Sequence, residues 1–231
     1  ANWSSSAILG DSIFVLDTEG NLYAAKLGEL KFSNYPTSVQ LDKILFTLGD
    51  NIWAISDNGK SLTLKNKGEF KTAQTLPDGF PTENIVSFTS SSGYTSLGYL
   101  FATKDGNGTI WSIDTKGNTR NLQAADGTIP YLKDPIVFQY SEMLGIIGGL
   151  KADGTSSSKC YSSKNSGAQW IQDWHKDMKG GIEGLSNAGT FILSSQGEII
   201  IVGGNTSDSV SKKVWKGVLN KLTADDLNYQ N

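Results

Sequence analysis

One recurring pattern limits what this chain can fold into: a short apolar run, a turn of Asp, Asn or Ser followed by Gly, and a second apolar run. It appears clearly over residues 13–25, 52–64 and 110–118. Asn, Asp and Gly tolerate the positive φ angles that tight hairpin turns impose. Helical periodicity is almost absent. The pattern therefore predicts an all-β protein built from antiparallel hairpins.

The hairpins group into clusters of three or four candidate strands. The clusters cover residues 7–35, 39–76, 85–123, 136–174 and 186–222. Their spacing of roughly 40–50 residues is the period of β-propeller blades. One such sheet cannot bury both of its faces, whereas sheets stacked around an axis cover one another. We therefore expect a single β-propeller domain over residues 1–231, with about five four-stranded blades and six blades as the alternative.

The two ends of the chain leave the closure of the ring open. The last cluster lacks a clear fourth strand, and the segment around Trp3–Ser6 is a candidate to supply it. A sixth blade would lie outside these residues or within the first cluster. The start at Ala1 without Met suggests a processed product or a piece of a longer protein. Residues 223–227 are the only helix candidate, with a frayed terminus as the alternative.

Composition excludes several classes of protein. Apolar residues make up 38% of the chain, enough to furnish a core, and the net charge is −3 with both signs interspersed. Without a basic stripe, nucleic acid is not an expected partner. No run of 18 apolar residues is present, so we expect no membrane span.

Cys160 is the only cysteine and cannot form an intramolecular disulfide. We expect a monomer.

One short motif resembles a known repeat. The residues Ser163, Asn165, Gly167 and Trp170 match the Asp-box of sialidase-like propellers, Ser-x-Asp-x-Gly-x-x-Trp, with Asn in place of Asp. The resemblance implies a structural turn with a left-handed glycine and a tryptophan packed between sheets, and no catalytic role. Asn makes the same turn hydrogen bonds as Asp, so the substitution is mild.

Two further segments resemble kelch-type blades: residues 146–149 and 200–204, where an apolar strand ends in a glycine pair. Paired glycines favour close backbone packing over ligand contact. With the closing run over residues 214–222, the chain is similar to uncharacterised exported propeller domains of Bacteroidetes. That resemblance implies a secreted domain of unknown function, periplasmic or at the cell surface.

The sequence contains no recognisable catalytic constellation. Sialidases resemble one another in holding the substrate carboxylate with three arginines, and Arg120 is the only arginine here. His175 is the only histidine, no Gly-x-Ser-x-Gly elbow is present, and no second imidazole or cysteine cluster would hold zinc. We expect no catalytic residues, no cofactor and no metal site. Calcium in an Asp-Gly turn stays open.

The expected function is therefore binding or scaffolding, with a glycan or a protein as the ligand. Loop aromatics on a rigid scaffold are plausible contacts, and the candidates are Trp174, Tyr131, Tyr94 and Phe80. The alternative is a glycan-active hydrolase with two carboxylates at the central channel, because a glycosidase needs only such a pair. Two carboxylates at one mouth of the channel, one with a raised pKa, would favour the enzyme.

Overall fold

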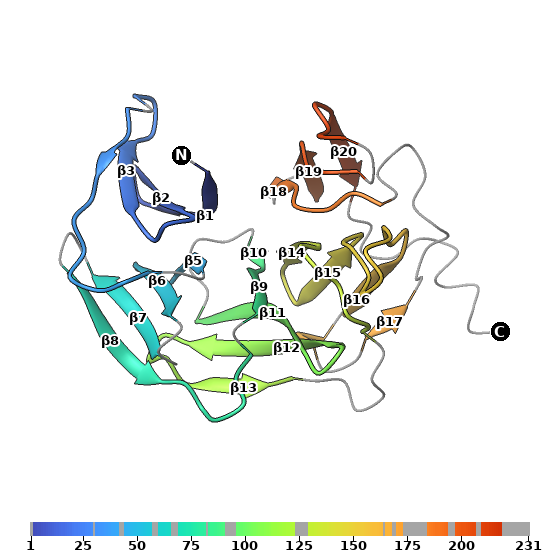
Figure 1. Ribbon diagram of the computed structural model, residues 1–231, viewed down its shortest axis with the longest axis horizontal. Helices are drawn as coiled ribbons and strands as arrows, with labels where there is room; N and C mark the ends of the chain where they lie inside the picture. Colours follow the sequence, from blue (N-terminus) through green and yellow to red (C-terminus); the bar gives the residue numbers. More distant parts are fainter. Residues whose placement is uncertain are drawn as a thin grey trace.

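In the residues that it describes, the computed structural model contains five sheets, antiparallel except for one short parallel pair, and no helix. The structure describes residues 2–29, 31–41, 44–56, 60–65, 69–81, 83–90, 96–122, 129–163, 165–167, 170–172, 184–193, 197–206 and 209–218. The sheets follow one another along the chain and are arranged side by side in an arc, like the blades of a propeller (Figure 1). We call them blades 1 to 5.

The bounds of the strands are as follows. Blade 1 contains β1 (Trp3–Leu9), β2 (Ser12–Asp17), β3 (Leu22–Lys26) and β4 (Ser33–Asn34). Blade 2 contains β5 (Ile44–Leu48), β6 (Asn51–Ser56), β7 (Lys60–Lys65) and β8 (Phe70–Thr75). Blade 3 contains β9 (Glu83–Ser87), β11 (Leu97–Lys104), β12 (Asn107–Asp114) and β13 (Thr119–Asn121).

The last two blades depart from four strands in opposite directions. Blade 4 contains β14 (Ile136–Tyr140), β15 (Met143–Ile147), β16 (Cys160–Ser163) and β17 (Ile171–Gln172), with β10 (Thr89–Ser90) added in parallel to β14. Blade 5 contains β18 (Gly189–Leu193), β19 (Glu198–Val202) and β20 (Val214–Val218). The chain thus passes from β9 of blade 3 directly into the edge of blade 4.

Burial between neighbouring blades explains why the second strands are apolar on both faces. In β6, Ile52, Trp53, Ala54 and Ile55 have no exposed surface. A strand that is covered on both sides reads as a continuous apolar run, because neither face needs polar side chains. One core lies between blades 1 and 2, and others lie between each following pair. Apolar packing between sheets is thus what holds the arc together.

The first strand of each blade lies on the inner side of the arc. β1 contacts β5, β5 contacts β9, and β14 contacts β18. These strands surround the centre of the arc (Figure 1).

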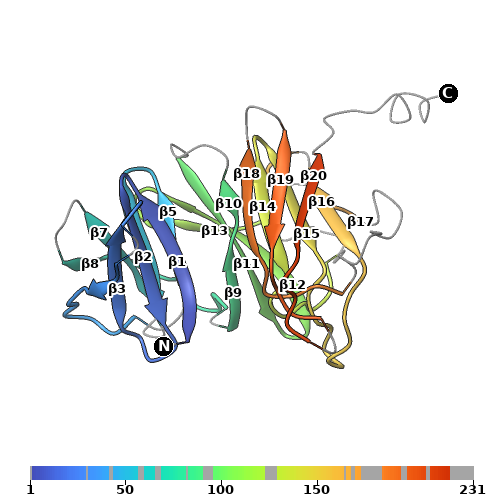
Figure 2. The ribbon, with the colours of Figure 1, turned by 90° about the horizontal axis from the view of Figure 1, so that it is seen from above.

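The all-β class and the propeller arrangement agree with the sequence analysis, but the expected closure by the N-terminal strand is wrong. Trp3 pairs with Asp17 and Ser5 with Leu16, so β1 is part of blade 1 and adds no strand to blade 5. Seen from above, blades 1 and 5 stand apart in front of the other blades (Figure 2). The helix expected over residues 223–227 lies outside the described residues.

Candidate functional site

A polar pocket of about 450 Å³ lies on the inner side of the arc, where residues of three blades meet. β1 of blade 1 contributes Ser4, and β9 of blade 3 contributes three residues. The segment before β14 of blade 4 contributes the rest. The lining residues are Ser4, Glu83, Asn84, Ile85, Tyr131, Lys133 and Asp134. We call it the axial pocket. Its size is in the range of small-molecule sites, which extends from about 300 to 1,000 Å³.

Asn84 joins two blades at the axial pocket. Its side-chain Nδ2 donates to Thr103 Oγ1 over 2.9 Å and to the hydroxyl of Tyr131 over 3.1 Å. Thr103 belongs to β11 of blade 3 and is buried, while Tyr131 lies 47 residues from Asn84 in the sequence and is half-buried. These bonds fix the orientation of the tyrosine ring at the pocket.

Three residues that enter inner strands share an unusual backbone conformation. Asn84, Asp134 and Asn187 have φ angles of 49°, 49° and 51°, each near the start of the inner strand of its blade. Asn and Asp adopt this left-handed conformation more readily than other non-glycine residues. The backbone N–H of Asn187 donates to the carbonyl of Asp134 over 2.8 Å, which ties the entry of blade 5 to that of blade 4. Backbone conformations of this kind cluster at functional sites.

The segment that carries Tyr131 and Asp134 is held in place by its backbone. The N–H of Lys133 donates to the carbonyl of Leu150 over 2.7 Å, and the N–H of Leu150 returns a bond of 2.9 Å. Leu132, which follows Tyr131, is fully buried in the core that blades 3 and 4 share. A fixed segment presents its side chains with little loss of entropy on binding.

The axial pocket combines both charges with neutral polar groups. Glu83 and Lys133 are exposed, and Asp134 is half-buried. The carboxylates accept hydrogen bonds, the ammonium donates them, and the tyrosine ring offers an apolar surface beside its hydroxyl. Such a set suits a neutral ligand with many hydroxyl groups. The pocket also contains the pair of carboxylates that a glycosidase requires.

The four predicted ligand-contact aromatics have different outcomes. Tyr131 lines the axial pocket, in agreement with the prediction that it lies in a loop. Phe80 also lies in a loop, but it is 8% exposed and packs edge-on against Trp111 with 4.9 Å between ring centroids, so its ring belongs to the core between blades 2 and 3. Tyr94 and Trp174, like His175, lie outside the described residues.

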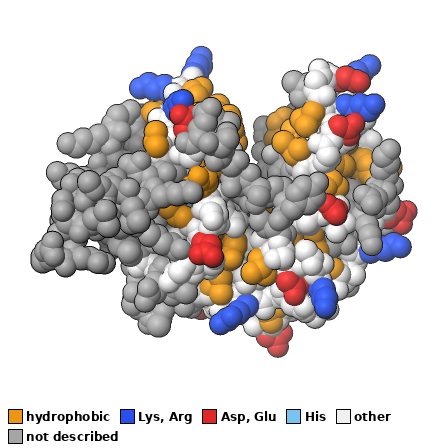
Figure 3. Space-filling view, turned by 180° about the vertical axis from the view of Figure 1, so that it is seen from behind, with side chains coloured by type: hydrophobic (Ala, Val, Ile, Leu, Met, Phe, Trp, Pro, Cys, Tyr) orange, Lys and Arg blue, Asp and Glu red, His pale blue; other side chains and the backbone are white. Residues whose placement is uncertain are grey.

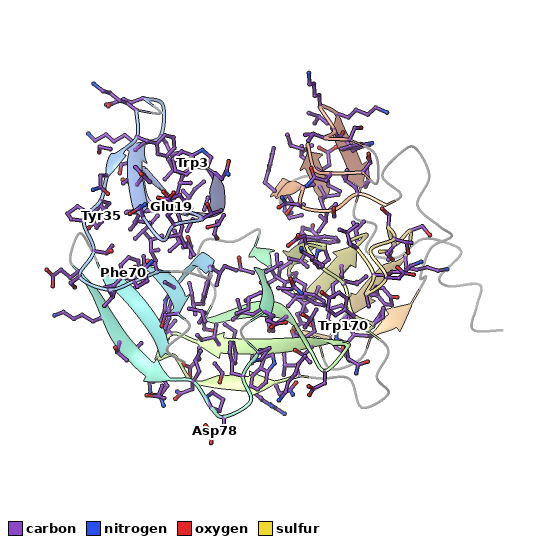
Figure 4. The ribbon with its side chains drawn as sticks, in the orientation of Figure 1. Trp3, Glu19, Tyr35, Phe70, Asp78 and Trp170 are labelled. Atoms are coloured by element: carbon purple, nitrogen blue, oxygen red, sulfur yellow. The ribbon has the colours of Figure 1, made fainter. Side chains whose placement is uncertain are left out.

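The turn at residues 163–170 has the expected glycine and tryptophan but a different central acceptor. Gly167 has a φ of 89°, and Trp170 is 4% exposed between blade 4 and blade 3 (Figure 4). The hydroxyl oxygen of Ser163 accepts the N–H of Gly167 over 2.9 Å, while Asn165 Oδ1 accepts the hydroxyl of Ser163. The hydroxyl of Ser163 therefore fixes the loop at Gly167, and the side chain of Asn165 orients that hydroxyl.

Two other turns are held by carboxylates of the same local sequence. Asp17 and Asp114 each begin an Asp-Thr-x-Gly-Asn turn, and Oδ1 of each accepts the backbone N–H groups two and four residues later. Burial alone would raise the pKa of both carboxyls. The side-chain and backbone hydrogen bonds from Asn21 and Asn118, respectively, outweigh it and lower each pKa below its ordinary value. These carboxylates are structural and lie outside the axial pocket.

A larger groove of about 620 Å³ lies beside blade 3. It extends from β11–β13 to Asn165 and Ser166 and includes Arg120. Two of its polar side chains already bind each other: Asn118 Nδ2 donates to Asp114 Oδ2 over 2.8 Å. The axial pocket is the better candidate, since three blades converge on it and its charged side chains face no such internal partner in the described residues.

Most residues of the axial pocket escaped the sequence analysis. Of its lining residues, only Tyr131 is among the ligand-contact candidates of the sequence analysis, and Glu83, Asn84, Lys133 and Asp134 are not. The missed signal is the recurrence of Asn or Asp at the entry of an inner strand: Asn84 is the second residue of β9, and Asp134 and Asn187 lie two residues before β14 and β18. Asn and Asp tolerate the left-handed conformation that the chain adopts at these entries.

Within the described part of the chain, no group of three or more His, Cys, Asp or Glu side chains is arranged to hold a metal ion. The same residues include no helix that is both long and apolar enough to cross a membrane.

Comparisons with known proteins place this fold in a family. A solved structure, entitled "Structure of YjhT", matches with a TM-score of 0.62 at 10% sequence identity, over 90% of this chain and 78% of that one. At this identity the likeness concerns the fold alone. No curated protein matches by sequence. A family model described as the DUF6242 beta propeller domain matches residues 1–226, and the chain therefore belongs to the DUF6242 β-propeller family.

Proposed function

We propose that this propeller is a binding module without catalytic activity, and that its axial pocket holds a neutral, hydroxyl-rich ligand such as the end of a glycan. The observation that carries the proposal is the convergence of polar side chains from three blades on one pocket. Ligands of rigid scaffolds commonly bind where loops from several elements meet.

The composition of the pocket supports a glycan more than a charged ligand. Glu83 and Asp134 accept hydrogen bonds, while Lys133 and Asn84 donate them. Two acids against one base give no excess of positive charge to attract a phosphate or a carboxylate. Tyr131 adds a ring on which the C–H groups of a sugar can pack.

Binding to a glycan array and calorimetric titration of each hit test the proposal. Tyr131→Ala and Asp134→Asn should each weaken binding at least about tenfold, the loss expected for one good hydrogen bond or ring contact. Tyr140→Ala is the matched control, because Tyr140 ends the inner strand β14 and does not line the pocket. Equal binding by all three variants and the unmodified chain would overturn the proposal.

A protein ligand is the other form of the binding hypothesis, and we propose that the module is exported, as the similarity to exported propeller domains suggests. If no glycan binds but a protein recovered by pulldown from the native host binds and Tyr131→Ala abolishes that binding, the pocket is a protein-contact site. Cell fractionation tests export, and recovery of the protein from the cytoplasm alone would contradict it.

A glycan hydrolase is the second candidate, and it is favoured by one observation: Glu83 and Asp134 line the same pocket. A retaining or inverting glycosidase places two carboxyls about 5–10 Å apart across the scissile bond. Chromogenic glycosides and natural oligosaccharides distinguish the candidates. Turnover that is lost in both Glu83→Gln and Asp134→Asn would establish the hydrolase and exclude a function by binding alone.

A further inference from the structure

The arc of blades is open between blade 1 and blade 5. Every blade shares a hydrophobic core with the next one along the chain, but blades 1 and 5 are separated by an opening (Figure 1). The space-filling view from behind shows the same opening as a notch in the molecular surface, with hydrophobic side chains on both of its sides (Figure 3).

Exposed hydrophobic side chains are concentrated in these two blades. Of the ten large hydrophobic side chains that are exposed in the described residues, all but Leu97 belong to blade 1, blade 5 or their loops. They are Trp3, Ile8, Leu27, Phe32, Phe191, Val202, Val210, Val214 and Val218. Single exposed apolar residues are ordinary on a protein surface, but two groups on facing sheets indicate a covered surface.

In blade 5, the alternation of side chains assigns the exposed residues to one face. Ile199 and Ile201 are buried in the core shared with blade 4. Because successive side chains of a strand point to opposite faces, Val202 in β19 lies on the other face, and Val214 pairs with it from β20. Val214 and Val218 are each 64% exposed on that face.

In blade 1, an aromatic cluster lies on the face turned away from blade 2. The ring of Trp3 packs against Tyr23 at 5.3 Å and against Phe32 at 5.8 Å between centroids. Trp3 is nevertheless 51% exposed, and it lies on the side of blade 1 beside the opening (Figure 4). Ile8, also 51% exposed, pairs with Ile13 on the same sheet.

We propose that the opening holds one further blade, a β-sheet with two apolar faces that belongs to the same polypeptide. The interfaces already present set the precedent, because each consists of two apolar sheet faces packed together. The solved structure of the same fold is longer than this chain's match, since about a fifth of it lies outside the matched part. This inference is independent of the proposed function.

The test compares Val214→Lys with Val210→Lys in the complete polypeptide that the gene encodes. Val214 lies opposite Val202 on the exposed face, whereas Val210, 72% exposed, lies in the loop before β20 and is the matched control. If a blade covers β20, Val214→Lys lowers Tm by at least about 4 °C, because it buries an unpaired charge, and Val210→Lys leaves Tm unchanged. Equal Tm values for the two variants would overturn the proposal.

A labelling measurement in the same polypeptide separates the possible occupants. With Cys160 replaced by Ser, Val214→Cys should react with a thiol reagent at least about tenfold more slowly than Val210→Cys, at all protein concentrations and in a monomer by sedimentation velocity. Protection that disappears on dilution together with a dimer would assign the face to a second copy. Equal rates would show an open face. Either result would refute the closing blade.

Discussion

Gly145→Ala tests the packing between blades 4 and 5, because the substitution acts on one aromatic ring. Gly145 in β15 pairs directly with Phe138 in β14, and the ring of Phe138 lies over the glycine. A Cβ at position 145 would overlap the ring: its three nearest atoms are all carbons of Phe138, and even the third is only 2.8 Å away. The ring must therefore move.

The ring has little room to move, which sets the magnitude. Phe138 is 5% exposed and belongs to the core that includes Ile136, Leu185 and Ile199. Displacing a ring in a close-packed core costs about 1–3 kcal/mol. For a chain of this size, each kcal/mol lowers Tm by about 2–4 °C. We expect Gly145→Ala to lower Tm by about 2–12 °C in a calorimetric or circular dichroism melt.

Two further variants make the expectation specific. Gly189→Ala is the matched control, since Gly189 also lies in a strand of this region but an added Cβ meets only Val202 O, at 3.8 Å. It should be neutral or slightly stabilising. Phe138→Leu combined with Gly145→Ala should cost less than the sum of the two single changes. Equal effects of the two glycine variants, or strict additivity of the pair, would refute the reasoning.

Two more predictions concern the turns. The pKa values of Asp17 and Asp114 are lowered in the folded state, so the stability that these carboxylates contribute is present above the unfolded pKa of about 3.9 and lost as the pH falls through the folded values. In thermal melts between about pH 6 and pH 2, Tm should fall less with decreasing pH in the Asp17→Asn/Asp114→Asn variant than in the unmodified chain. Parallel curves of Tm against pH would contradict this. Ser163→Ala leaves the buried N–H of Gly167 without its acceptor and should cost about 1–3 kcal/mol in denaturant unfolding, against no measurable loss for Ser12→Ala, whose hydroxyl bonds only to exposed Asp11.

The fold was predictable because its signals are local. The Asp-Thr-x-Gly-Asn turns and the apolar runs on either side of them define hairpins, and the regular spacing of the hairpins defines blades. The pairing of Trp3 with Asp17 was not predictable in this way. A strand at the N-terminus can join either end of a ring, and only tertiary contacts decide between them.

The site was less predictable than the fold because it depends on contacts between distant residues. Tyr131 was identifiable as a loop aromatic, whereas its partner Asn84 lies 47 residues earlier and in a different blade. Phe80 also stands between two prolines in a probable loop, yet its ring is buried against Trp111. The local sequence predicts a loop for both Tyr131 and Phe80. Only the burial of their rings in the folded protein distinguishes the pocket residue from the core residue.

The most direct test of the account is whether two blades really meet at the axial pocket. Asn84 Nδ2 lies 3.1 Å from the hydroxyl of Tyr131, so the side-chain amide protons are close to the tyrosine ring. A nuclear Overhauser effect between the Asn84 side-chain amide and the Tyr131 ring should be observed, and it should vanish in Tyr131→Ala. If resolved and assigned signals show no such effect, the blades do not converge as described and the axial pocket does not exist.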